Sequence, residues 1–91
     1  MINSLTKKEL EEFDYLIKVI YLGVMKGKSN IEPYPNAIDT IKDNVGIKSF
    51  CNIMEILEKE NYTMPCPNGV PDTPVLTEKG ENYAKNKLNL K

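Results

Sequence analysis

Proline is confined to two stretches of this chain, and this distribution limits where helices can form. Of the six prolines, Pro33 and Pro35 lie in one stretch and the other four lie between residues 65 and 74. A proline lacks an amide donor and disfavours helical angles in the residue before it. We therefore expect a connector over residues 28–36, a non-helical segment over residues 62–76, and helices elsewhere.

The first predicted helix runs from Thr6 to Lys26. Thr6 and Glu9 have the spacing of a capping box, in which each side chain accepts a hydrogen bond from the backbone amide of the other residue. Gly27 suits the left-handed conformation that ends a helix. Apolar residues recur at helical spacing on one broad face of this segment: Leu10, Phe13, Leu16, Ile17, Ile20, Tyr21 and Val24.

The same helix carries a second apolar stripe, Tyr15, Val19 and Leu22, on its opposite side. One interpretation is that a later helix of the same chain, such as the C-terminal one, covers this stripe. The other is a seam for self-association in a homodimer, because a small monomer rarely leaves an apolar stripe exposed.

Two more helices are predicted on either side of a glycine break. Asn36 is expected to cap a short helix that continues to about Asp43. Asn44-Val45-Gly46 forms the break, and a longer helix follows over residues 48–60. Cys51 borders the inner face of that helix and is expected to be buried. The residues expected to face inward are Ile47, Phe50, Ile53, Met54 and Leu57.

The remaining third of the chain is predicted to form a hairpin followed by a helix. Tyr62–Met64 and Thr73–Leu76 are short extended runs, and Asn68-Gly69 between them is a turn signal. Thr77 is expected to cap a last helix that continues to about Leu88. A helix, a short helix, a longer helix, a hairpin and a final helix make up the order of elements in a winged helix-turn-helix.

Two segments resemble a known group of proteins. Leu76-Thr-Glu-Lys-Gly-Glu-Asn-Tyr83 is similar to the segment that closes the wing in many small bacterial winged-helix proteins. Leu57-Glu-Lys-Glu-Asn-Tyr62 is similar to the exit from their third helix. The chain resembles the small YjcQ-like proteins of Gram-positive bacteria and their prophages, and more distantly the MarR-like and PadR-like regulators. The resemblance implies an α+β winged helix with three helices, a two-stranded wing and a C-terminal helix.

The resemblance also implies a DNA-binding transcription regulator, of the kind prophages carry, whose third helix enters the major groove of double-stranded DNA. Asn52 would pair with adenine, and the lysines would contact phosphates. A dimer would add Lys42 from each copy. The candidate DNA contacts are therefore Lys48, Ser49, Asn52, Lys59 and Lys42.

The charge distribution weighs against DNA binding. The net charge is −1, every basic residue is lysine, and no basic residue lies between Lys59 and Lys79. Glu55 lies on the same outward side as the candidate contacts, where its carboxylate would repel phosphate. The alternative is a protein–protein interaction module, for dimerisation or as an adaptor, that keeps the winged-helix scaffold without binding DNA.

Catalysis and metal binding find no support in the sequence. The chain has no histidine, no nucleophile motif and no glycine-rich phosphate loop. Cys51 and Cys66 lack further ligands for zinc. We therefore expect no enzyme activity, no cofactor and no small-molecule ligand. The length of 91 residues fits one domain, and the absence of a long apolar run predicts a cytoplasmic protein that does not enter a membrane.

Overall fold

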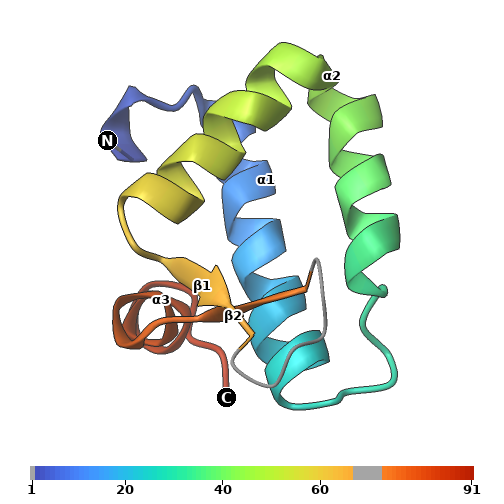
Figure 1. The fold of residues 1–91 in the computed structure, drawn as a ribbon, viewed down its shortest axis with the longest axis vertical. Coiled ribbons are helices and arrows are strands. Elements are labelled where there is room, and N and C mark those ends of the chain that lie inside the picture. Colours follow the sequence, from blue (N-terminus) through green and yellow to red (C-terminus); the bar gives the residue numbers. More distant parts are fainter. Residues whose placement is uncertain (1, 67–72) are drawn as a thin grey trace.

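In the computed structural model, residues 2–66 and 73–91 are described. They form an α+β domain of three helices, α1, α2 and α3, and a two-stranded antiparallel hairpin that lies beside α3 (Figure 1). A short 3-10 turn, η1 (Ile2–Ser4), precedes α1. The order of elements is helix, helix, strand, strand, helix, because the second and third predicted helices are joined as α2.

Helix α1 (Lys7–Lys18) continues without interruption into η2 (Val19–Met25), a segment of wider π-helical turns. The predicted capping box is confirmed, since the Glu9 amide donates to Thr6 Oγ1 at 3.1 Å and the Thr6 amide donates to Glu9 Oε1 at 2.9 Å. Gly27 ends the helix with φ at 67°, a left-handed angle that glycine adopts without a steric penalty. The predicted helix from Thr6 to Lys26 is therefore confirmed.

Helix α2 (Tyr34–Lys59) begins earlier than the sequence predicts. Pro33 occupies the N-cap position and Pro35 lies in the first turn, where a missing amide costs no helical hydrogen bond. The prediction that Asn36 caps this helix is therefore wrong, because the two prolines fit its start instead of preceding it.

Gly46 divides α2 into two arms, residues 34–45 (the first arm) and residues 47–59 (the second arm). Its φ of 86° and ψ of 167° lie outside the helical region, in a part of conformational space reserved for glycine. Figure 1 shows the resulting bend, with α1 between the two arms in this view. The predicted break at residues 44–46 is confirmed.

The end of α2 is fixed by a left-handed asparagine. Asn61 has a φ of 61°. The Tyr62 amide donates to the Leu57 carbonyl at 2.9 Å, and the Asn61 amide donates to the Glu58 carbonyl at 3.2 Å. These two bonds are those of a Schellman motif, and they explain why asparagine serves at this helix exit.

The chain then forms the predicted hairpin. Strands β1 (Thr63–Pro65) and β2 (Pro74–Leu76) pair antiparallel, with Met64 opposite Val75. Thr77 caps α3 (Glu78–Asn82) by accepting from the Gly80 amide, and π-helical turns follow as η3 (Tyr83–Lys87). The predicted turn at Asn68-Gly69 lies outside the described residues.

Three aromatic rings join distant parts of the chain in the core. Phe13 of α1, Tyr62 at the start of the hairpin and Tyr83 of η3 meet edge to face in pairs, with ring centroids 5.2 to 5.6 Å apart. The Tyr83 hydroxyl also donates to Asp14 Oδ1 at 2.6 Å. The C-terminal segment is thereby anchored to α1. Besides Phe13, the large, fully buried side chains are Leu16, Ile17, Val19, Ile20, Ile41, Ile53 and Leu57.

The second stripe of α1 is covered within the chain. Val19 is fully buried, and Tyr15 and Leu22 are half-buried against the core. The Tyr15 hydroxyl donates to Glu32 of the connector, and Thr40 of the first arm donates to the same carboxylate at 3.1 Å. The connector and the first arm thus lie on this side of α1, while the C-terminal segment contacts Phe13.

Two residues of the second arm lie on a different side from the one predicted. Ile47 was expected to face inward but is 63% exposed, and Cys51 was expected to be buried but is exposed. The buried side of this arm is centred on Ile53, Ile56 and Leu57. Ile47 and Cys51 lie on another side of the same helix from these buried residues, so the inward side is rotated from the one predicted.

Candidate functional site

The second arm of α2 presents a polar face to solvent. Lys48, Asn52 and Lys59 lie on it at helical spacing, all exposed, while Ile53 and Leu57 on the other side of the helix are fully buried. Three of the five predicted DNA contacts are therefore on one surface.

The other two predicted contacts are placed differently. Ser49 is half-buried and directed toward α1 by a hydrogen bond to Glu9. Lys42 lies on the first arm, across the bend, with its ammonium 5.0 Å from the centre of the Phe50 ring. This cation–π contact holds the Lys42 side chain along the protein surface.

Glu9 connects the start of α1 to the candidate DNA-contact face. It is only 6% exposed, and its Oε2 accepts a hydrogen bond from Asn52 Nδ2 at 3.3 Å. The hydrogen bond from the Thr6 amide, followed by that from Ser49, lowers the pKa of Glu9 below its ordinary value of 4.5 despite the opposing effect of burial. The carboxylate is therefore ionised at neutral pH and can only accept hydrogen bonds.

Sequence reasoning assigned Glu9 to the capping box alone. Its contact with Asn52 joins residues 43 apart in the chain. The Thr6 amide and Asn52 donate to different oxygens of the Glu9 carboxylate. The capping-box motif therefore does not indicate the contact with Asn52.

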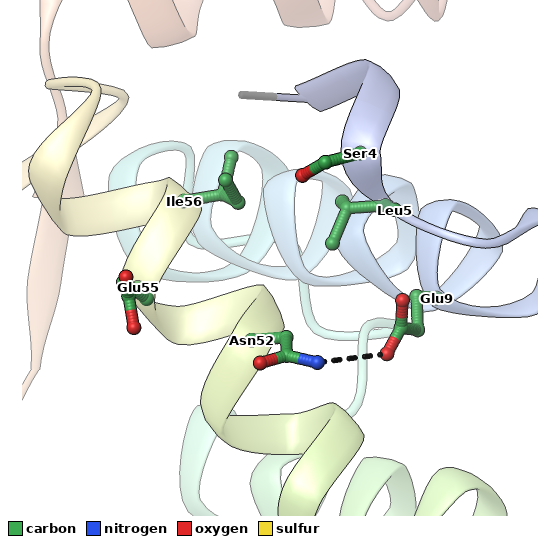
Figure 2. Close-up of a pocket in the computed structure, with 6 residues that line it drawn as sticks. All are labelled: Ser4, Leu5, Glu9, Asn52, Glu55 and Ile56. Atoms are coloured by element: carbon green, nitrogen blue, oxygen red, sulfur yellow. Dashed lines mark hydrogen bonds between the residues drawn. The ribbon is translucent and has the colours of Figure 1, made fainter.

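A shallow groove of about 250 Å³ lies beside this contact (Figure 2). Figure 2 shows the Asn52 nitrogen turned toward Glu9 and the Asn52 oxygen turned away from it. The groove combines apolar and polar groups, and its lining consists of Ser4, Leu5, Glu9, Asn52, Glu55 and Ile56.

The net charge of the polar face is small. Lys59 Nζ lies 3.4 Å from Glu55 Oε1, and both side chains are mostly exposed, so the pair adds little stability but offsets one charge with the other. Glu58 is also exposed on this arm. Within residues 2–66 and 73–91, Lys48 forms no ion pair, and it is the cation best placed to meet a phosphate.

The described part of the chain gives little indication of a metal site, of cysteine chemistry or of a membrane span. No three histidine, cysteine, aspartate or glutamate side chains gather there in a way that could hold a metal ion. Cys66 is half-buried, and both cysteines are free thiols. Across the same residues, none of the helices has the length and apolar character that crossing a membrane requires.

Comparison of the chain with protein-family models, with curated proteins and with solved structures finds no significant match.

Proposed function

We propose that this protein is a winged-helix transcription regulator that binds double-stranded DNA through the second arm of α2. In this proposal the two arms of α2 form a helix-turn-helix, and β1 and β2 form the base of the wing. The observation that carries the proposal is the exposed polar face of the second arm, with Lys48, Asn52 and Lys59 on the side opposite its buried residues. A helix exposed in this way is suited to the width of the major groove.

The orientation of Asn52 supports a specific preference. Because the ionised Glu9 carboxylate only accepts, the Asn52 amide must direct an N–H toward it. The carbonyl oxygen and the second N–H of Asn52 are then left for a ligand. An acceptor beside a donor is complementary to the N6 and N7 edge of adenine. We therefore expect Asn52 to favour an A·T pair.

The charges of the arm support weak binding. Phosphate contacts supply much of the affinity for DNA, and Lys48 is the main cation not offset on this face. We expect the affinity to lie in the range of non-specific binders, about 10⁻⁴ to 10⁻⁶ M at physiological salt, and to decrease as salt is raised.

Fluorescence anisotropy with mixed-sequence duplex DNA at low salt tests this proposal. Lys48→Ala should weaken binding to all sequences, and Asn52→Ala should reduce the preference for A·T-containing sites by about 1–3 kcal/mol. Lys85→Ala, which removes an exposed lysine from η3, is the matched control and should have little effect. Absence of any binding well above ~100 μM protein would reject the proposed function.

A further inference from the structure

The second arm also carries apolar side chains on another side, next to its polar face. Ile47 and Cys51 are exposed, and Phe50 and Met54 are half-buried. We call these four residues the bend stripe. They have the i, i+3, i+4, i+7 spacing of one helix face. Single apolar residues are common on protein surfaces, whereas a continuous stripe on a helix is typical of a face that packs against a partner.

Net charge beside the bend stripe has opposite signs at its two ends. Lys48 lies at the N-terminal end of the second arm. Toward the C-terminal end, Glu55 and Glu58 outnumber Lys59, which lies 3.4 Å from Glu55. Two parallel copies of this arm would bring the two Lys48 ends to one end of the interface and the two acidic ends to the other. Two antiparallel copies would place Lys48 beside Glu55 of the other copy, twice, with the helix dipoles also opposed. The charge pattern is therefore complementary to itself in the antiparallel arrangement.

We propose that two copies of this chain associate through the bend stripe, second arm against second arm, about a two-fold axis close to Cys51. The axis position follows from the pairing, because the midpoint between residues 48 and 55 and the midpoint between residues 47 and 54 lie half a residue on either side of residue 51. Such an isologous interface places the same residues on both sides. Self-association would then use this surface and not the covered stripe of Tyr15, Val19 and Leu22.

This inference does not depend on DNA binding. If both proposals hold, Lys48 serves two partners, phosphate in the DNA complex and Glu55 in the dimer. The two states would then exclude each other, and added DNA would convert dimer to monomer.

Sedimentation equilibrium over a range of concentrations is the first test. The wild-type chain should show a reversible monomer–dimer equilibrium, and Ile47→Ser should raise the dissociation constant by about tenfold or more. Met64→Ser is the matched control, since Met64 is the other exposed large apolar residue among those described and lies on β1. A chain that stays monomeric at every concentration would overturn the proposal.

Charge reversal tests the antiparallel arrangement. Lys48→Glu and Glu55→Lys should each weaken the dimer, and the double variant should restore it. The two residues are seven positions apart, too far for an ion pair within one helix, so restoration would report a contact between chains. A double variant no better than either single variant would contradict this arrangement.

Crosslinking locates the axis. A short bis-maleimide should join two chains through Cys51 in the Cys66→Ser variant, and Ile47→Ser added to that variant should abolish the product. A dimer that persists in Ile47→Ser and gives no Cys51 crosslink would show that another surface is used.

Discussion

At the residue scale, Glu9 holds the start of α1 and the second arm of α2 together. One carboxylate oxygen accepts from the Thr6 amide at 2.9 Å and the other accepts from Asn52 at 3.3 Å. A buried carboxylate is tolerated when hydrogen bonds replace its hydration. Glu9 therefore supports stability and also sets the orientation of a candidate DNA contact.

Acid should remove the contribution of Glu9. Its pKa is lowered in the folded state, so its stabilisation is fully present above the unfolded value near 4.5 and is lost as pH falls through the folded value. Glu9→Gln retains a residue that suits the capping box but does not titrate. We expect the difference in unfolding free energy between wild type and Glu9→Gln, measured by urea denaturation, to shrink in acid.

The contrast with an exposed carboxylate makes this measurement specific. Glu11 is exposed on α1, and Glu11→Gln should change the unfolding free energy little at any pH. Burial raises the pKa of Asp14, which is the opposite direction to the shift of Glu9. Asp14 is present in the wild type and in both variants, so its contribution cancels when their unfolding free energies are compared. A Glu9→Gln difference that does not change with pH would contradict the assigned role.

At the scale of elements, the bend in α2 depends on one glycine. Gly46 has backbone angles that would cost another residue about 1–3 kcal/mol to adopt. An added Cβ would meet no atom within 4 Å there, so the cost of Gly46→Ala is conformational and not a clash. We expect Gly46→Ala to lower the unfolding free energy by about 1–3 kcal/mol, measured by chemical denaturation.

Asp43→Ala, at an exposed position of the first arm, is the control for this change and should be nearly neutral. If Gly46→Ala were equally neutral, the bend would not need glycine.

Sequence reasoning succeeded for the elements where local chemistry decides. The capping box, the left-handed Gly27, the break at Gly46 and the Thr77 cap are each specified by a few neighbouring residues. It failed at the start of α2, because proline is compatible with the first turn of a helix and does not have to precede it. It also failed at Ile47 and Cys51, because helical periodicity does not reveal how a bend rotates the two arms relative to α1.

At the scale of the whole molecule, the C-terminal helix is held against the hairpin by close backbone packing. A Cβ on Gly80 would lie 2.2 Å from the Tyr62 carbonyl oxygen, which accepts from the Thr77 amide at 3.1 Å. Because the clash is with backbone, no side-chain rotation relieves it. This contact joins α3 to the residue before β1, so the residues next to Gly80 in the chain do not indicate its partner.

Gly80→Ala should therefore separate α3 from the hairpin and lower the unfolding free energy by about 1–3 kcal/mol, the usual cost of overpacking. Thermal unfolding followed by circular dichroism measures it. Asn82→Ala, exposed on the same helix, should leave the midpoint nearly unchanged. Equal midpoints for both variants would mean that the backbone can move apart without penalty.

The three-ring cluster of Phe13, Tyr62 and Tyr83 has a consequence for biosynthesis. Its members come from early, middle and late parts of the chain, so the core closes only when contacts of long sequence separation form. During translation, α1 leaves the ribosome long before Tyr83 does. Until then the nascent polypeptide keeps the apolar side of α1 without its last aromatic partner, so the core is completed only once Tyr83 is available.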